Sequence, residues 1–467
     1  SRVPPVTSQR CVAAEGSTTG GSGAAGPAQA GAGDPEPLTG MLGDLVPGTT
    51  GSAPSAYVRL GAQVCFGADD GVLGRELWCS DGTPAGTRLV ADLYPGVIGS
   101  DPDHMVVLGD RLLFTAGRPG AGRSLWRTDG TAAGTALVFE FPPNSGDPGP
   151  KVVMNGVAYF AATGVSTGRE LWRSNGTATG TWRVRDIRPG AASSAPIRLT
   201  VIGTLLYFVA DDGAHGDELW RSNGSEGGTL RLTDIWPGTG HSYPRFLVEQ
   251  GPRLFFVADD PSNGEQIWRT EGDVASTVRV TTIAGLRPTN LARLGNNTLL
   301  FSGVTGGLGR EPHRLVNLQL TGIVQLAADI GAGSAGSDPG PFTVHDGIAH
   351  FAATTASHGR ELWRSDGTPS GTWLLADLVP GPGDGEPSCL AWFNDRLYFH
   401  SAMPRTLWQS DGSTPGTRQL ASPSRLACGF TPLGARLLYR AAQYLPAQTG
   451  VEPWALFDDA LFGNGFQ

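Results

Sequence analysis

The chain has 467 residues, of which 69 are glycine and 35 are proline, and this share of poor helix formers excludes a mainly helical protein. Hydrophobic residues make up 39% and charged residues 16% of the chain, which indicates a folded but weakly charged protein. The net charge of −9 disfavours an electrostatic interaction with nucleic acid, and the sequence has no apolar run of the about 18 residues that a transmembrane helix needs.

The first 37 residues are rich in glycine, alanine, serine and proline and have no hydrophobic periodicity. Because this composition is typical of a flexible segment, we assign residues 1–37 to an arm outside the fold. The chain does not open with a signal peptide, and we expect one to have been removed on export.

From residue 38 onward the chain consists of repeats, each marked by one aromatic anchor. The first anchors lie about 46–48 residues apart, which is the length of one propeller blade. The nine anchors are Trp78, Trp126, Trp172, Trp220, Trp268, His313, Trp363, Trp408 and Trp454.

Each repeat predicts four short strands separated by turns. In the repeat around Trp220, the first strand follows Pro196, the second is the alternating run at 205–210, and the third carries the tryptophan. We therefore predict an all-β protein, a single β-propeller of four-stranded blades with nine blades. Because propellers usually have four to eight blades, eight blades with one degenerate repeat outside the ring is the alternative.

The two ends of the repeat region are incomplete in a complementary way. Residues 38–48 form a predicted fourth strand that no other strand precedes. The last repeat has a second strand at 436–440 and a third at 452–454, but no fourth. We expect the N-terminal strand to join the last blade and close the ring. The predicted propeller spans residues 38–458, and a C-terminal tail follows at 459–467.

The third strand and the turn after it carry one motif, complete at residues 361–372 as Glu-Leu-Trp-Arg-Ser-Asp-Gly-Thr-Pro-Ser-Gly-Thr. This motif resembles the ELWxxDGTxxGT repeat family, found in secreted or surface proteins of bacteria, notably myxobacteria. The resemblance covers residues 38–458 and implies the architecture and an extracytoplasmic location, but it carries over no active site. The repeats around Trp268 and His313 depart from the motif.

The Asp-Gly-Thr turns begin with a residue that has a side-chain oxygen. Asn replaces Asp freely at this position, so the negative charge is not needed. Because both side chains accept backbone N–H bonds in tight turns, we interpret them as structural caps in preference to ligand-binding residues. They are Asp81, Asp129, Asn175, Asn223, Asp366 and Asp411.

Acidic residues also occur in pairs between the second and third strands. Clustered carboxylates beside glycine suggest Ca²⁺, which needs six to eight oxygen ligands. Solvated hairpin turns are the alternative interpretation. The residues are Asp69, Asp70, Asp211, Asp212, Asp259 and Asp260, and no other cofactor is indicated.

A glutamate precedes Leu-Trp in several repeats, at Glu76, Glu170, Glu218 and Glu361. A residue that recurs so regularly is not expected to be catalytic. We predict that it forms hydrogen bonds between blades, with neighbouring arginines as candidate partners.

Strand register predicts one disulfide. If Ala68 pairs with Glu76 across the second and third strands, Cys65 lies directly opposite Cys79, where Cβ atoms are about 4.5–5.5 Å apart. The two residues are therefore predicted to be bonded.

A second disulfide is predicted between Cys389 and Cys428, which occupy nearly equivalent places on the first strands of consecutive blades. Cys11 remains unpaired in the arm. Paired cysteines favour an oxidising compartment, and buried free thiols are the alternative.

Residues on the first strands are expected to line the central channel, where a propeller would bind a ligand. From successive blades these are His104, Lys151, Arg198, Arg245 and Asn290, with Cys389 in a later blade. The partly cationic set suggests a small anion or an acidic sugar, and a water-filled channel without a ligand is the alternative.

No nucleophile elbow, phosphate loop or dinucleotide motif is present. We therefore expect a secreted or cell-surface, non-enzymatic module that binds a carbohydrate or protein partner as an extracellular monomer. A hydrolase or lyase that acts on polysaccharide at the channel mouth is one alternative, and a structural coat or adhesion element is another.

Overall fold

The computed structural model describes residues 38–142, 147–318, 322–403, 405–420, 424–443 and 449–457. The predicted arm, the predicted tail and Cys11 lie outside these ranges. Within them the secondary structure is almost entirely β, with one short 3-10 helix, η1 (Gly333–Ala335). No helix of the described segments has the length and apolar character needed to cross a membrane.

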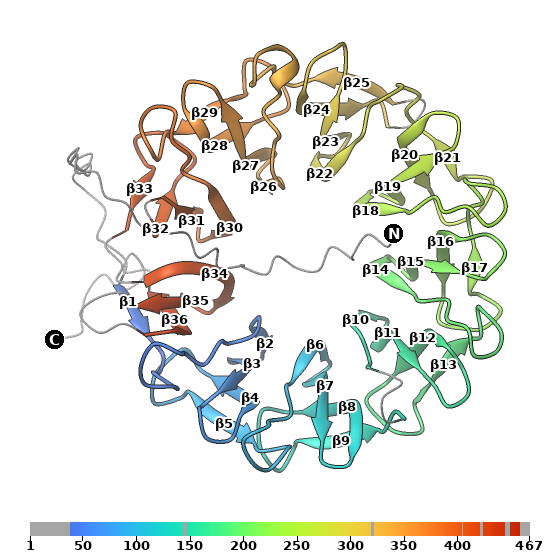
Figure 1. Cartoon of the computed structure of the whole chain (residues 1–467), viewed down its shortest axis with the longest axis vertical. Coiled ribbons are helices and arrows are strands. Elements are labelled where there is room, and N and C mark those ends of the chain that lie inside the picture. The colour runs from blue at the N-terminus through green and yellow to red at the C-terminus, as the bar shows by residue number, and fades with distance from the viewer. Residues whose placement is uncertain are drawn as a thin grey trace. The chain divides into compact units, whose positions relative to one another are not determined.

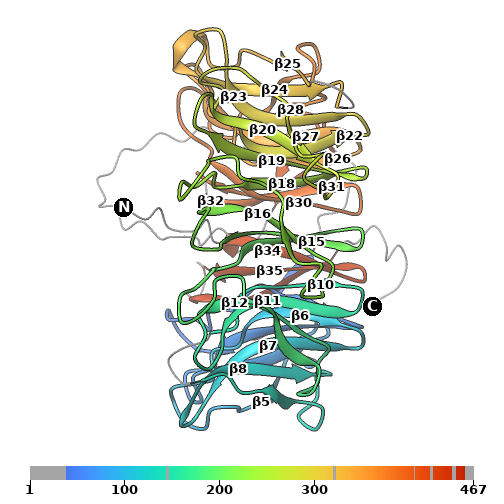
Figure 2. The same ribbon diagram turned by 90° about the vertical axis from the view of Figure 1, so that its right-hand side faces the viewer.

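The described strands form nine antiparallel sheets of four strands each, arranged as the blades of a ring (Figure 1). In the edge-on view of Figure 2, the blades lie within one layer. The predicted nine-bladed propeller is confirmed, and the alternative of eight blades is wrong.

The strands of blades 1 to 4, numbered from the centre of the ring outward, are as follows. Blade 1 contains β2 (Val58–Leu60), β3 (Gln63–Asp69), β4 (Arg75–Ser80) and β5 (Arg88–Ala91). Blade 2 contains β6 (Asp103–Leu108), β7 (Arg111–Arg118), β8 (Ala121–Thr128) and β9 (Ala136–Phe139). Blade 3 contains β10 (Lys151–Met154), β11 (Val157–Thr163), β12 (Arg169–Ser174) and β13 (Thr181–Arg185). Blade 4 contains β14 (Ile197–Ile202), β15 (Leu205–Asp211), β16 (Asp217–Ser222) and β17 (Leu230–Arg231).

Blades 5 to 9 continue in the same order. Blade 5 contains β18 (Arg245–Gln250), β19 (Arg253–Asp260), β20 (Gly264–Thr270) and β21 (Val278–Arg279). Blade 6 contains β22 (Thr289–Gly295), β23 (Thr298–Val304), β24 (Arg310–Val316) and β25 (Ile323–Leu326). Blade 7 contains β26 (Thr343–His345), β27 (Ile348–Thr355), β28 (Gly359–Ser365) and β29 (Trp373–Ala376). Blade 8 contains β30 (Pro387–Phe393), β31 (Arg396–Ala402), β32 (Arg405–Ser410) and β33 (Arg418–Gln419). Blade 9 contains β34 (Ser424–Leu433), β35 (Arg436–Gln443), β36 (Val451–Phe457) and β1 (Leu38–Met41).

The N-terminal strand closes the ring. β1 is the outer strand of blade 9 and pairs antiparallel with β36, with Met41 opposite Trp454. In Figure 1 the blue β1 accordingly lies beside the red β36. The predicted closure is confirmed.

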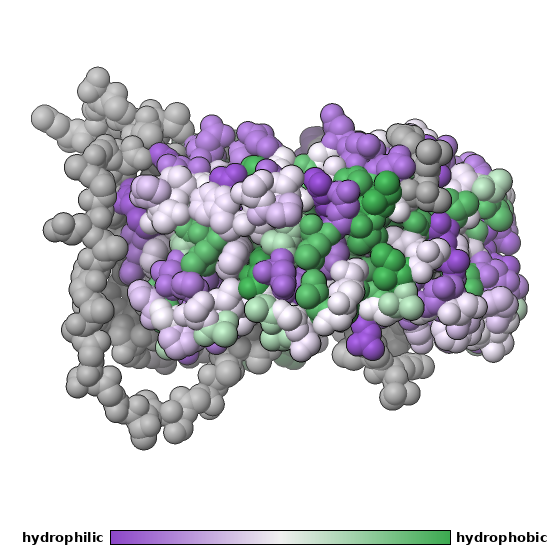
Figure 3. All heavy atoms as spheres, turned by 90° about the horizontal axis from the view of Figure 1, so that it is seen from above, coloured by the Kyte–Doolittle hydropathy of each residue, from purple (hydrophilic) through white to green (hydrophobic). Residues whose placement is uncertain are grey.

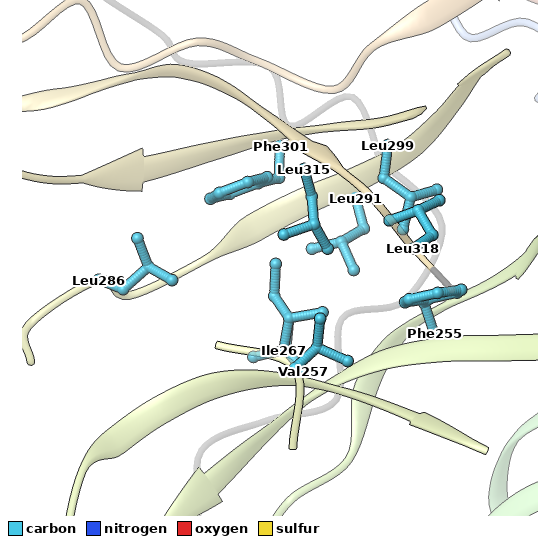
Figure 4. Close-up of a cluster of buried hydrophobic side chains, with 10 residues drawn as sticks. Phe255, Val257, Ile267, Leu286, Leu291, Leu299, Phe301, Leu315 and Leu318 are labelled. Atoms are coloured by element: carbon cyan, nitrogen blue, oxygen red, sulfur yellow. The ribbon is translucent and has the colours of Figure 1, made fainter. Parts of the chain in front are cut away.

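The core lies between the blades, because the second strand of each blade is buried on both faces. In blade 5, Phe256 packs towards blade 4, whereas Phe255 and Val257 point the other way, towards blade 6. Figure 4 shows this second cluster, in which Phe255 and Val257 meet Phe301 and Leu315 of blade 6. Neighbouring blades are thus joined by apolar layers.

The rim of the ring is mixed in character. Figure 3 shows apolar side chains in green among polar ones on one side of the molecule. On the outer strands, Trp182 and Ile323 are 44% and 50% exposed. Scattered exposed residues of this kind are normal for a soluble surface and define no site.

Both predicted disulfides are present. Cys65 and Cys79 face each other across β3 and β4 in the predicted register, and their sulfurs are bonded. Cys389 and Cys428 join β30 to β34, the inner strands of blades 8 and 9. One disulfide therefore lies within a blade and the other connects two blades.

A buried glutamate on the third strand binds the link, which we define as the segment between the fourth strand of one blade and the first strand of the next. The carboxylate of Glu76 accepts hydrogen bonds from the N–H groups of Leu93 (3.1 Å), Tyr94 (3.1 Å) and Ser100 (2.8 Å). It also accepts a bond from the Ser100 hydroxyl, at 2.5 Å. We call a third-strand glutamate that binds the link in this way a clamp glutamate. The clamp glutamates are all fully buried and are Glu76, Glu170, Glu218, Glu311, Glu361 and Glu452.

The bonds of these glutamates differ from the prediction, because they go to the backbone and hydroxyl groups of the link and not to arginines of a neighbouring blade. Arginines form a separate tie between blades. Arg127, Arg173 and Arg364, each directly after the anchor tryptophan, donate to a turn carbonyl of the next blade at 3.1–3.2 Å. At the closure, Arg436 donates in the same direction to the Asp81 carbonyl, at 2.8 Å.

We expect Glu452→Ala to weaken ring closure, because Glu452 accepts bonds from the N–H (2.9 Å) and hydroxyl (2.6 Å) of Ser52. Leaving both buried donors without an acceptor is expected to cost about 3 kcal/mol of unfolding free energy. Urea unfolding followed by tryptophan fluorescence measures this loss. The control is Asp81→Asn, which should change stability by less than about 0.5 kcal/mol because asparagine caps the same turn elsewhere. An equal effect of both variants would contradict the assigned role of the clamp.

Candidate functional site

The link between blades 2 and 3 lacks the usual clamp. Ser124 occupies the position of the clamp glutamate in blade 2, and its hydroxyl donates to the Gly122 carbonyl instead. The link is held by Thr115, whose hydroxyl donates to the Pro148 carbonyl at 2.8 Å. Lys151 reinforces this contact, because its Nζ donates to Thr115 Oγ1 at 2.6 Å.

A pocket of about 740 Å³ opens beside this link. Its wall is formed by residues of blades 2 and 3, of the links before and between them, and of the link that follows blade 3. The charged residues among them are Asp101, Arg118, Arg123, Asp147 and Arg169. The pocket therefore brings cations and carboxylates of different blades together.

Arg123 is the centre of the charge network in this pocket. It contacts Asp101 at 3.1 Å, Asp103 at 2.6 Å and Asp147 at 3.0 Å. Asp103 also pairs with His104 Nδ1, at 3.0 Å. Burial alone would raise the pKa of Asp103, but the bond from His104 and the charge of Arg123 outweigh burial and lower it.

Lys151 is the only lysine of the chain, and it is 9% exposed. Burial lowers the pKa of Lys151 to about 7, although the carboxylates of Asp103 and Asp147 oppose this shift. A lysine in this state is largely a neutral amine at slightly alkaline pH. Its second hydrogen bond, of 3.2 Å, goes to the Gly149 carbonyl.

The predicted channel residues do not form one site. His104, Arg198 and Asn290 share a positive φ of 48°, 56° and 55° at a bulge of the first strand. Arg245 lies one position earlier and pairs with Asp259 and Glu265, both at 2.8 Å. His104 pairs with Asp103, and the charge of the same aspartate acts on Lys151.

The predicted Ca²⁺ loops use their carboxylates for their own turns. Asp70 Oδ1 accepts bonds from the N–H groups of residues 72 and 73, at 2.9 and 2.7 Å, and Asp69 accepts one from residue 71. Asp212 and Asp260 accept backbone bonds in the same way, while Asp211 and Asp259 pair with arginines. Within the described ranges no three His, Cys, Asp or Glu residues are grouped so as to hold a metal ion.

The Asp-Gly-Thr turns have the capping geometry inferred from the sequence. Asp81 Oδ1 accepts bonds from the N–H and hydroxyl of Thr83 at 2.9 and 2.6 Å, and Asn175 Oδ1 accepts the same pair of bonds from Thr177 at 3.1 and 2.7 Å. The amide oxygen thus replaces the carboxylate oxygen directly.

The comparisons place this propeller beside peptidases of known structure. No protein-family model and no curated protein matches the sequence. A puromycin hydrolase matches at 15% identity with a TM-score of 0.37, over 75% of this chain and 59% of its own. A puromycin-hydrolyzing peptidase of Mycobacterium tuberculosis matches at 11% and 0.41, over 91% and 63%. A prolyl endopeptidase matches at 11% and 0.43, over 74% and 54%.

This chain spans less than two thirds of each of those proteins, and likeness at this identity extends to the fold alone. These matches are to peptidases, so they contradict the expectation of a non-enzymatic binding module and give it no support. The sequence reasoning looked for local catalytic motifs, whereas the polar cluster here is assembled from blades 2 and 3 and the links around them.

A buried histidine, His350, makes the stability of the propeller depend on pH. His350 holds the place that Tyr159 and Tyr207 hold in other second strands, and it is 2% exposed. Burial, together with the charges of Arg364 and His345, lowers the pKa of His350 to about 4. Below about pH 6.5 the imidazole of His350 is therefore protonated in the unfolded chain but stays neutral in the folded chain. The free energy of unfolding consequently decreases as the pH falls towards 4.

We expect His350→Tyr to reduce acid sensitivity, because tyrosine fits the equivalent positions and does not titrate in this range. The wild type should lose up to about 1.4 kcal/mol per pH unit through this residue between pH 6.5 and 4. Thermal unfolding at pH 7.5 and pH 5.0 compares the two proteins. His358→Tyr in a half-exposed loop is the control, and an equal change in both variants would refute the explanation.

Proposed function

We propose that the chain is a hydrolase of acyl bonds, with Lys151, which lies beside the pocket at blades 2 and 3, as general base. The observation that carries the proposal is the hydrogen bonding of the lysine amine. A neutral amine has two N–H bonds and one lone pair. Lys151 donates to Thr115 Oγ1 and to the Gly149 carbonyl, so both N–H bonds are used and the lone pair is left to accept a proton.

The proposed reaction follows from this arrangement. The Lys151 amine takes a proton from a water molecule while the water oxygen attacks the acyl carbon. Arg118 and Arg123 line the pocket and supply positive charge where the carbonyl oxygen becomes an oxyanion. The Lys151 ammonium then returns its proton to the leaving oxygen or nitrogen as the acyl bond breaks. Water is thus added across one ester or amide bond.

The other contacts of the lysine fit this role. The Thr115 hydroxyl donates to Pro148, so it orients the amine and does not serve as the nucleophile. The two disulfides support the further proposal that the chain is exported to an oxidising compartment, as an extracellular or cell-surface protein.

The test uses p-nitrophenyl esters and aminoacyl anilides as probes with the full chain. The wild-type rate should rise with pH and level off above about pH 7, as Lys151 becomes neutral. Lys151→Arg keeps a hydrogen-bond donor but cannot lose its proton near neutral pH, so it should lower the rate about 100-fold or more. Lys151→Met should do the same.

Arg198→Met, a change on the exposed first strand of blade 4, serves as the control and should retain the wild-type rate. Folding of each variant is checked by thermal unfolding. The proposal fails if the wild type hydrolyses none of the probes, or if the folded Lys151→Arg protein keeps the wild-type rate and pH profile.

A further inference from the structure

Arginines at the start of four third strands share one arrangement. The Nε atom of each faces the carboxylate that directly precedes the proline of the following link. The pairs are Arg75 with Asp101 (3.2 Å), Arg123 with Asp147 (3.0 Å), Arg310 with Asp338 (3.8 Å) and Arg360 with Glu386 (3.4 Å).

Arg169 holds the same position in blade 3, but its acidic partner is missing. The residue before the proline of the following link is Ala195. Its backbone has the same left-handed conformation, with φ of 48° against 50° at Asp101 and 48° at Glu386. The link is therefore shaped as in the other blades, and only the carboxylate has been removed.

The remaining contacts of Arg169 leave its charge unmatched. Nη1 donates to the main-chain carbonyl of Asp147 at 2.6 Å. Arg310 and Arg360 make the same bond to a link carbonyl. This bond is therefore a structural feature that the equivalent arginines share, and it does not neutralise the charge of Arg169. Across the described ranges, no carboxylate lies within ion-pair distance of Arg169.

Arg169 itself lines the pocket, together with Ser193, which lies two residues before Ala195 in the following link. Burial lowers the pKa of the Arg169 guanidinium, and the charge of Asp147 only partly opposes this. A partly buried cation without a counter-ion gains from a charged ligand, and the planar guanidinium matches the two oxygens of a carboxylate.

We propose that Arg169 recognises the carboxylate of a bound substrate, which takes the place that Asp101, Asp338 and Glu386 fill beside their own arginines. This inference rests on the proposed hydrolase and defines its substrate class: an acyl compound that carries a carboxylate group. Arg169 is the residue that sets this specificity, while Lys151 acts on the scissile bond.

The test is isothermal titration of the full chain with succinate, with sodium sulfate as the second probe. The wild type should bind succinate more tightly than sulfate. Ala195→Asp restores the internal partner of Arg169 in a backbone that accepts Asp at equivalent positions. It should weaken succinate binding about tenfold or more while keeping or raising the melting temperature.

The matched control is Ala53→Asp, at the same position of another link, where φ is 43° and the preceding third strand begins with Val451 in place of arginine. This variant should bind succinate like the wild type. Arg169→Met should lose binding as Ala195→Asp does.

The inference is overturned if the wild type does not bind succinate, if sulfate binds equally well, or if Ala195→Asp leaves binding unchanged. Its failure is distinct from failure of the hydrolase proposal. Succinate binding that Ala195→Asp removes, without hydrolysis of any ester, supports the carboxylate site and refutes the enzyme. Hydrolysis at equal rates of carboxylate-bearing and neutral esters supports the enzyme and refutes the carboxylate site.

Discussion

The propeller depends on one interaction, the hydrogen bonds that a buried carboxylate accepts from the link that leaves its blade. In blade 1, Glu76 satisfies three backbone N–H groups and a hydroxyl of a link that has no regular strand pairing of its own. Buried polar groups need hydrogen-bond partners. The glutamate supplies them to the N–H groups of the link, which would otherwise need water as their acceptor. Glu452 makes the equivalent contacts with Ser52 across the closure, which means that the ring is closed by the same device that joins its other blades.

The blades without this glutamate are held by other bonds. In blade 5, Gln266 donates to the Ile283 carbonyl of the link at 2.9 Å. Blade 8 has Thr406 at this position, and the disulfide between Cys389 and Cys428 joins blades 8 and 9. In blade 2, Lys151 and Thr115 bridge to the next blade. The three blades that lack the clamp glutamate therefore each have another bond to the link or to the next blade.

The sequence predicted what repetition and strand register determine. Nine anchors predicted nine blades, and the pairing of Ala68 with Glu76 predicted the bond between Cys65 and Cys79. Lys151 and His104 were expected at a ligand site, but the pocket was not predicted, because it includes link residues such as Asp101 and Asp147 that the strand pattern does not place. The bulges of the first strands also shift the register, so that aligning these strands by sequence placed Arg245 and Lys151 in positions equivalent to His104, which they do not hold. Two signals were nevertheless visible: Ser124 where six other blades have glutamate, and Ala195 where four other links have an acidic residue before proline.

These two substitutions lie next to residues that line the same pocket, since Ser124 follows Arg123 and Ala195 lies two residues after Ser193. Each is a small residue where other blades carry a carboxylate, one in blade 2 and the other in the link that leaves blade 3. The second leaves Arg169, in the wall of the pocket, without the ion pair that the equivalent arginines of four other blades make. A repeat protein provides its own internal comparison, since equivalent positions share a backbone and differ only in side chain. Where Arg169 lines a pocket without the carboxylate that the equivalent arginines have, the charge of the site no longer follows from the fold, and a negatively charged ligand is its natural complement.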